Sequence, residues 1–164
     1  MNTSEPFLAF SRNVQFVEAV AEQLGIVFDE LLSAPEGAHL ANESDEWDGL
    51  FGSRTFKIRV QREKEDMATG QILFVEISSR GLVEVEDVNW TLDGDEHHDD
   101  SSILTLPLDM NGDPTEAAAT IIGGVCTQPA NEVSNALRKY CKRLLGSAPE
   151  PALRSDFRFP SSDL

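Results

Sequence analysis

The chain has 164 residues, of which 40% are hydrophobic, so it favours a single domain with a real core and argues against wholesale disorder. Its formal net charge of -16 at pH 7 should repel nucleic acid and anionic membrane surfaces, because phosphate binding needs clustered Lys and Arg. A basic protein surface or a bound cation is the natural counterpart, although an acidic composition also serves solubility alone.

The N-terminal stretch and the two cysteines indicate in which compartment the protein is expected. The N-terminal stretch MNTSEPFLAF has neither the basic n-region nor the long apolar h-region of a signal peptide, and no apolar run reaches the length of a membrane span. Cys126 and Cys141 form no CxxC pair, so two thiols in a reducing compartment are the simplest interpretation, with one disulfide left open. We therefore expect a soluble, cytoplasmic protein without a cofactor.

The N-terminal third predicts a helix and then a loop. Ser11 is a suitable N-cap for a helix over residues 13–25, where apolar residues recur at helical spacing and Gly25 is a suitable stop. Residues 26–34 are either a short helix or a continuation after a break. Residues 33–49, rich in small and acidic side chains, predict a loop.

Strand patterns follow from about residue 50. Phe56, Ile58 and Val60 alternate with polar side chains, which predicts an amphipathic strand over 55–61. Residues 62–70 predict a charged connection, and residues 71–79, 82–92 and 102–108 predict three more strands, the last ending at Pro107. The stretch DGDEHHDD, residues 93–100, interrupts this alternation.

Helices return after the strands. Asp113 as N-cap, followed by Pro114 and Glu116, predicts a helix start, with Gly123-Gly124 as its end. Pro129 opens a last helix, whose buried stripe we expect to be Val133, Leu137, Tyr140, Cys141 and Leu144. The order predicts a single α+β domain over 1–146, with a mixed central sheet, an N-terminal helix and two C-terminal helices. Residues 147–164 are a Pro- and Ser-rich tail that we expect to be flexible.

The stretch DGDEHHDD has three interpretations. Adjacent side chains of an extended segment point apart, so His97 and His98 cannot easily share one metal ion. A solvated loop is the favoured interpretation, and an acidic patch facing a partner is the second. Its value would then lie in charge rather than in coordination.

Two further candidates for chemistry are weak. Asp109, Asn111 and Asp113 have the spacing of the start of a calcium loop, but Pro114 stands where glycine is required and Thr120 where glutamate is required. A turn leading into the Asp113 cap explains the same residues. Cys126 and Cys141 lie in or near helices, where core positions are favoured over catalysis.

The stretch 48–90 resembles phage-borne proteins of the PD-(D/E)xK, or restriction-endonuclease-like, family. The resemblance rests on Asp48, on Lys57-Ile58-Arg59, on Thr69-Gly70 and on the strand LFVEI around Glu76, with Trp90 where that family has an aromatic strand. The family implies a strand Glu that holds Mg²⁺ and a Lys that activates water. Here Lys57 and Arg59 occupy those positions, and an ammonium has no lone pair for a metal. The resemblance thus implies a nuclease-like scaffold without a working site, unless Asp48 and Glu76 retain metal binding.

Three functions compete. The favoured one is a non-enzymatic acidic binding protein that engages a basic, nucleic-acid-binding protein surface, as inhibitors and DNA mimics of phages and mobile elements do. The expected binding residues are acids around one aromatic anchor: Glu43, Asp45, Glu46, Trp47, Asp48, Glu84, Glu86, Asp87, Asp95, Glu96, Asp99 and Asp100. The alternatives are a metal-dependent nuclease of the resembled family, and a phage assembly protein or acidic secretion chaperone. A homodimer is an open alternative for any of them, and neither nucleic acid nor membrane is an expected direct partner.

Overall fold

A computed structural model of the chain describes residues 5–48, 52–128 and 131–146, and side chains within the first range for residues 8–41. The elements in chain order are α1 (Glu5–Ser33), the short 3-10 helix η1 (Pro35–Gly37), β1 (Ala41–Asp48), β2 (Ser53–Lys64), β3 (Met67–Ser78), β4 (Leu82–Asp93), β5 (Glu96–Pro107), α2 (Pro114–Cys126) and α3 (Glu132–Leu145). This order confirms the α+β fold with one N-terminal and two C-terminal helices.

The five strands form one sheet in the order β1-β2-β3-β4-β5, and each is antiparallel to its neighbours. The predicted mixed sheet was therefore wrong. The strands follow one another through short turns, and short turns can join only antiparallel neighbours, because a parallel pair needs a long crossover.

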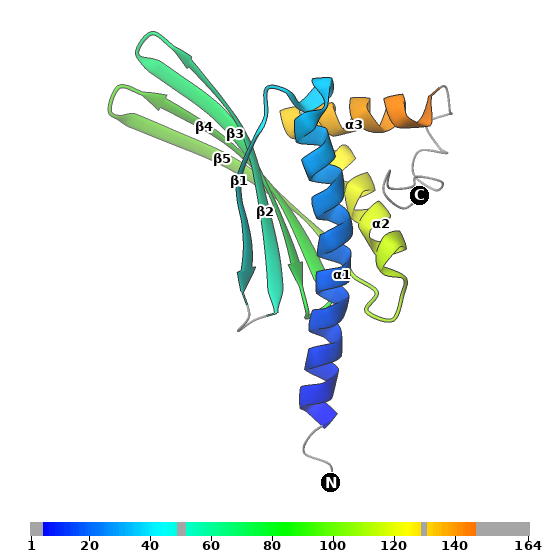
Figure 1. Cartoon of the computed structure of the whole chain (residues 1–164). Coiled ribbons are helices and arrows are strands. Elements are labelled where there is room, and N and C mark those ends of the chain that lie inside the picture. Colours follow the sequence, from blue (N-terminus) through cyan, green and yellow to red (C-terminus); the bar gives the residue numbers. More distant parts are fainter. Residues whose placement is uncertain (1–4, 49–51, 129–130, 147–164) are drawn as a thin grey trace.

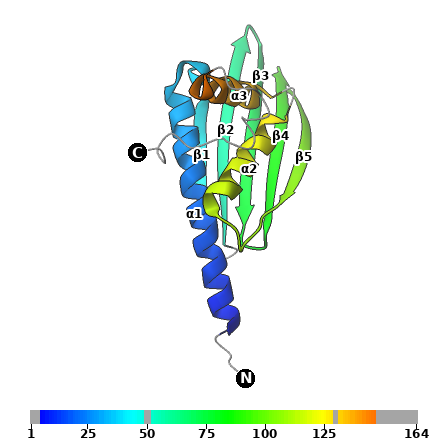
Figure 2. The same ribbon diagram turned by 90° about the vertical axis from the view of Figure 1, so that its right-hand side faces the viewer.

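All three helices cover the same face of the sheet (Figure 1). The ends of the strands that carry the β2–β3 and β4–β5 turns bend away from the helices, so these hairpins project beyond the helical layer. The view in Figure 2 shows α1 beside the β1–β2 side, α2 crossing the sheet obliquely and β5 at the opposite edge. Half of each long strand is thus packed under helices, and the opposite face of the sheet is uncovered by them.

The core lies between the sheet and the helices. The predicted inward alternation of Phe56, Ile58 and Val60 is confirmed, since each is at most 4% exposed. Other fully buried side chains come from every layer: Val17, Val20, Leu24, Leu31, Leu73, Val75, Ile77, Val83, Val85, Val125 and Leu137. Tyr140 ties α3 to α1 by donating a hydrogen bond to Glu30 at 2.6 Å. Leu144, predicted to be buried, is 39% exposed in the last turn of α3.

Three glycines predicted to end helices, Gly25, Gly123 and Gly124, instead lie inside them. α1 begins at Glu5, ahead of the expected cap Ser11, and continues through Gly25 to Ser33. A Cβ at Gly25 would lie 3.8 Å from the Phe56 ring, and one at Gly124 only 2.6 Å from Leu106. Gly124 thus lets α2 approach β5 closely, whereas the space at Gly25 would accept a Cβ in ordinary contact. Tertiary packing offsets the cost of about 1 kcal/mol that each glycine adds in a helix.

The predicted start of α2 is confirmed, and that of α3 is shifted. Asp113 caps α2 by accepting a hydrogen bond from the Thr115 amide at 2.9 Å. Asn131 caps α3 by accepting from the amides of Val133 and Ser134. Pro129, the expected opening residue, lies outside the described residues, as do the tail 147–164 and its expected flexibility.

Three segments predicted as loops are more regular than expected. Residues 33–49 include η1 and β1, and the charged connection 62–70 shrinks to the turn Glu65-Asp66 between two long strands. The stretch DGDEHHDD is a hairpin: Asp93 ends β4, Gly94-Asp95 form the turn, and β5 starts at Glu96. Gly94 has φ 61°, the positive value that the first turn position of a type II′ hairpin requires. Polar composition hid these strands, and at the β2–β3 and β4–β5 hairpins the strand ends are polar because they project into solvent.

Candidate functional site

The face of the sheet opposite the helices, called the open face below, carries the side chains that alternate with the buried core. The strand registers place these side chains in rows that cross β2, β3, β4 and β5. Three consecutive rows are Lys57-Phe74-Glu86-Ile103, Arg59-Ile72-Val88-Ser101 and Gln61-Gly70-Trp90-Asp99. Because successive side chains of a strand point to opposite faces, these rows share the open face and their neighbours face the helices.

Along β4, the apolar side chains move from the face covered by the helices to the open face. Val83 and Val85 face the helices and are fully buried, whereas Val88, Trp90 and Leu92 lie on the open face. β3 behaves similarly, because Ile72 and Phe74 are apolar on the open face near the same end. An antiparallel sheet with one solvated face normally presents polar residues to water throughout. The open face therefore departs from that pattern where the hairpins project beyond the helices.

This change of side creates an apolar groove of about 530 Å³ on the open face. The groove is lined by Ile72, Phe74, Glu86, Val88, Trp90, Leu92, His97 and Asp99. Leu92 is 41% exposed, and Ile103, the neighbour of Glu86 in the same row, is 59% exposed. Exposed apolar side chains rimmed by polar ones are typical of interaction sites.

Trp90 lies against the backbone of Gly70, its partner across β3 and β4. A Cβ at Gly70 would come within 2.5 Å of the indole ring, so only glycine leaves room for this arrangement. An aromatic side chain that covers a cross-strand glycine restores packing that the glycine lacks. The indole thereby packs on the Gly70 backbone and lines the groove.

Three carboxylates stand beside the groove on the open face. Glu76 and Glu84 are directly opposite each other on β3 and β4, and Glu86 follows two residues after Glu84. Among the described residues, none of the three makes a hydrogen bond or an ion pair. Like charges directly opposite each other in a sheet destabilise it, so this acidic trio costs the fold stability.

The basic residues of the open face lie on β2 and engage neighbours there. The Lys57 ammonium lies 5.6 Å from the centroid of the Phe74 ring. Arg59 donates to Gln61 at 3.0 Å, and Gln61 donates to Glu63 at 3.2 Å. The positive charges are thus partly satisfied along β2, and the negative charge of the acidic trio and Asp99 dominates the β4–β5 side of the groove.

The structure separates the predicted acidic binding residues into three places. Glu43, Asp45, Glu46, Trp47 and Asp48 lie on β1, at one edge of the sheet, and their side chains lie outside the described residues. Four others lie on the β4–β5 hairpin at the opposite edge: Asp95, Glu96, Asp99 and Asp100. Strands spaced about 4.8 Å apart put roughly 19 Å between β1 and β5. Glu84 and Glu86 lie between them on the open face, so the predicted set does not form one patch.

Asp87 is the clearest correction to the predicted site. It faces the helices, is 6% exposed and accepts a hydrogen bond from the Asn131 side chain at 2.7 Å. Beside it, Gln71 donates to Asn89 at 2.6 Å and accepts from the Glu132 amide at 2.6 Å. Asp87 therefore holds the N-terminal end of α3 on the sheet and is not available to a partner.

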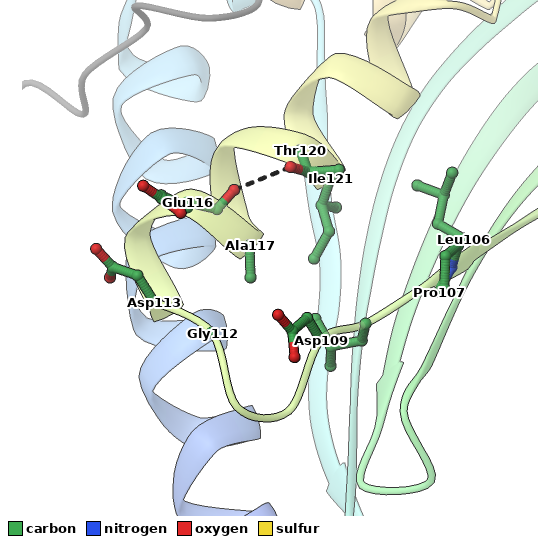
Figure 3. A pocket seen from close by; sticks show the side chains of 10 residues that line it. Leu106, Pro107, Asp109, Gly112, Asp113, Glu116, Ala117, Thr120 and Ile121 are labelled. Atoms are coloured by element: carbon green, nitrogen blue, oxygen red, sulfur yellow. Dashed lines mark hydrogen bonds between the residues drawn. The ribbon is translucent and has the colours of Figure 1, made fainter.

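A second hollow of about 270 Å³ lies between the end of β5 and α2 (Figure 3). Asp109, Asp113 and Glu116 border it, but their carboxylates do not converge on one point in Figure 3. Asp109 accepts from the Asn111 amide at 3.0 Å, and Asp113 caps α2. The predicted turn and cap are confirmed at this segment, and both carboxylates have structural partners.

A metal-binding cluster is not assembled among the side chains that the structure describes. Within residues 8–41, 52–128 and 131–146, no three His, Cys, Asp or Glu side chains are grouped to hold a metal ion. Lys57, Arg59 and Glu76 share the open face, and the Asp48 side chain lies outside the described residues. Cys126 and Cys141 are not joined by a disulfide, and a side-chain contact with Cys126 together with burial raises the pKa of Cys141, which disfavours its thiolate.

Sequence reasoning missed the groove and its central residue Trp90. The signal was present in the strand LVEVEDVNWTLD. After Leu82, its apolar residues occupy odd positions at Val83 and Val85 and even positions at Val88, Trp90 and Leu92. A change of parity inside one strand moves the apolar residues to the other face of the sheet. The chosen anchor was instead Trp47, because it stands among acids in the sequence.

Comparison of the chain with protein-family models, curated proteins and solved structures gives no match. Among the described helices, none is both long and apolar enough to cross a membrane.

Proposed function

We propose that the chain is a non-enzymatic binding protein whose open face engages a basic region of a partner protein. The observation that carries this proposal is the uncovered apolar groove beside three carboxylates that have no partner among the described residues. A partner with apolar side chains flanked by Lys or Arg would bury the groove and neutralise the carboxylates. The cytoplasm is the proposed location, where Cys126 and Cys141 would stay reduced.

The binding energies expected from charge pairs and from a buried tryptophan support this choice of site. Exposed charge pairs each contribute only about 0.2–1 kcal/mol, so charge alone gives weak, salt-sensitive attraction. A tryptophan in a desolvated centre commonly contributes 2 kcal/mol or more to an interface. Trp90 therefore supplies the anchor, and the acidic trio supplies steering and selection of a basic partner.

The partner class that fits is a protein surface that otherwise binds nucleic acid. Such surfaces are basic, and carboxylates held on a rigid sheet offer the charge that phosphates would offer. The net charge of -16 adds long-range attraction toward such a surface. An inhibitor that occupies a nucleic-acid site is the specific form of the proposal.

The test is affinity capture from a bacterial lysate on immobilised protein, with identification of retained proteins and elution by a salt gradient. Trp90→Ala is the site variant, and Leu144→Ala is the control, because Leu144 is an exposed apolar residue on α3 and does not line the groove. A basic protein that is retained by wild type and Leu144→Ala, lost with Trp90→Ala and displaced by added DNA or RNA supports the proposal. Equal retention by all three proteins would overturn it.

An acidic secretion chaperone or assembly protein is the second candidate, and one observation favours it. The groove runs along projecting hairpins, which suits an extended segment of a partner better than a flat folded surface. Proteolysis of the captured complex distinguishes the two functions. A short protected fragment of the partner would favour the chaperone, whereas an intact folded domain would favour the inhibitor.

The nuclease alternative keeps a direct test of its own. Incubation with plasmid and single-stranded DNA in the presence of Mg²⁺ or Mn²⁺ would reveal cleavage. Activity that disappears in both Asp48→Ala and Glu76→Ala would replace the binding proposal with an enzymatic one.

A further inference from the structure

The outer edge of β5 exposes a row of backbone amides, and the register fixes which ones. The Leu108 amide donates to the Gly81 carbonyl at 2.8 Å, directly beyond the last strand pair, Leu82 with Pro107. Residues of an antiparallel strand alternate between bonding inward and pointing outward. Even-numbered residues of β5 therefore bond to β4, and the outward amides belong to His97, Asp99, Ser101, Ile103 and Thr105.

The turn between β4 and β5 leads independently to the same assignment of inward-bonding and outward-pointing amides. Asp93 and Glu96 flank the two-residue turn Gly94-Asp95, and the pair that closes such a turn is hydrogen bonded. Glu96 is again an even-numbered residue that bonds inward. Pro107, which has no amide hydrogen, occupies an outward position, where a proline removes no bond to β4.

β5 differs from the other edge of the sheet in its regularity. The register of β1 shifts between Asn42 and Ser44, whereas the register of β5 with β4 is unbroken over all 12 residues of β5. Bulges, lysines and prolines are the usual devices that protect an edge from further pairing. β5 has no lysine and no shift, and its proline stands at the last position.

The charges along β5 select what can pair with it. Glu96 and Asp100 lie on one side of the strand and Asp99 on the other, so an added strand would meet carboxylates on both faces. A second copy of this chain, with its own net charge of -16, is repelled. A segment with Lys or Arg is attracted, and an apolar side chain of that segment can pack on Ile103, which is 59% exposed.

We propose that β5 accepts an extended, basic segment of the partner as a sixth strand of the sheet. The inference rests on the proposed function and specifies how the partner is held. Backbone hydrogen bonds to the outward amides give the attachment, and side chains on the open face reach Asp99 and the groove beside Trp90. Addition of a strand to a free edge is a general mode of peptide recognition.

The experiment measures binding of a fluorescently labelled probe by anisotropy at low ionic strength. The probe is a blocked ten-residue peptide in which lysine alternates with valine, and a glutamate–valine peptide is its charge control. Ser101→Pro removes one outward amide and leaves the bonds to β4 in place. Ser101→Ala is the matched control, because it removes the hydroxyl and keeps the amide.

Ser101→Pro is expected to weaken binding of the lysine–valine peptide about fivefold or more, and Ser101→Ala less than about twofold. Ser102→Pro tests the register itself, since it removes an inward amide. It should lower the melting temperature by several degrees, roughly the loss of one ladder bond, while Ser101→Pro should leave it unchanged.

The outcomes separate this inference from the proposed function. Binding that is weakened by Trp90→Ala but not by Ser101→Pro would overturn strand addition and leave the groove as the binding site. Binding that neither variant changes, or no binding of the lysine–valine peptide, would overturn both. Equal binding of the glutamate–valine peptide, or self-association through β5 in sedimentation, would overturn the selection of a basic segment.

Discussion

The two faces of the sheet differ in where along the strands their apolar and polar side chains lie. The covered face is apolar under the middle of the helical layer and polar at the N-terminal end of α3. There Asp87 bonds to Asn131, and Gln71 bonds to Asn89 and to the Glu132 amide. The open face is charged behind the helices, at Glu76 and Glu84, and apolar beyond them, at Val88, Trp90 and Leu92. The difference supports the proposal that a partner covers the projecting hairpins from the side that the helices do not reach.

The largest expected effect tests the difference between the two faces by mutating two adjacent residues of β3 that face opposite sides. Leu73→Ala removes a side chain that is 0% exposed and should lower the free energy of unfolding by about 2–5 kcal/mol. Ile72→Ala, on the open face, should cost about 1 kcal/mol or less and weaken partner binding instead. Chemical denaturation and the capture assay measure the two effects. Equal destabilisation by both would show that the open face is part of the core.

A second effect concerns the polar end of the covered face. Asn131→Ala removes the cap of α3, worth about 1 kcal/mol, and leaves the buried Asp87 without its partner, which costs roughly 1–3 kcal/mol more. The double variant Asp87→Ala/Asn131→Ala should then be less destabilised than the sum of the two single variants. Denaturation of all four proteins gives the coupling. Strict additivity would contradict the role given to Asp87.

Glu84→Lys sharpens the comparison because stability and function should move in opposite directions. A lysine opposite Glu76 replaces a like-charge pair with an attractive one, which should raise the free energy of unfolding by about 0.2–1 kcal/mol. The same change should weaken capture of a basic partner. Glu22→Lys, at an exposed position in the middle of α1, is the control for net charge. Destabilisation by Glu84→Lys would show that the acidic trio has a structural role.

The smallest effect is a pH dependence at the junction of β2 and α3. The hydrogen bond and ion pair with Arg62 hold the pKa of Glu132 below its ordinary value. A carboxyl group with a lowered pKa stabilises the fold above its ordinary pKa, and that stabilisation is lost as the pH falls through the folded-state value. Melting temperatures of wild type and Arg62→Ala should therefore differ above about pH 5 and converge toward pH 3. Solvent screening at this exposed pair keeps the difference small, and a constant difference across that range would rule out the linkage.

Sequence reasoning predicted the elements that bury apolar side chains, because burial leaves a periodic pattern. The alternation around Phe56 was recognised for that reason, and the Asp113 cap was recognised from the residue types of a helix start. Sequence reasoning failed at β1, whose composition is polar, and at the hairpin ends, including residues 93–100, because strand ends that project into solvent carry no apolar period and look like loops. The candidate site was only partly predicted. Glu84 and Glu86 were found as acids, but Asp87 looked identical to them in sequence, and only the register of β4 reveals that it faces inward.

The packing of Trp90 on Gly70 also gives the molecule an optical reporter. The chain contains two tryptophans, so a Trp47→Phe variant leaves one emitter, which lines the groove. An indole that is partly hydrated emits at longer wavelength than one surrounded by apolar side chains. Occupation of the groove should consequently shift the emission of this variant to the blue, and the titration of that shift reads out occupancy without any label on the partner.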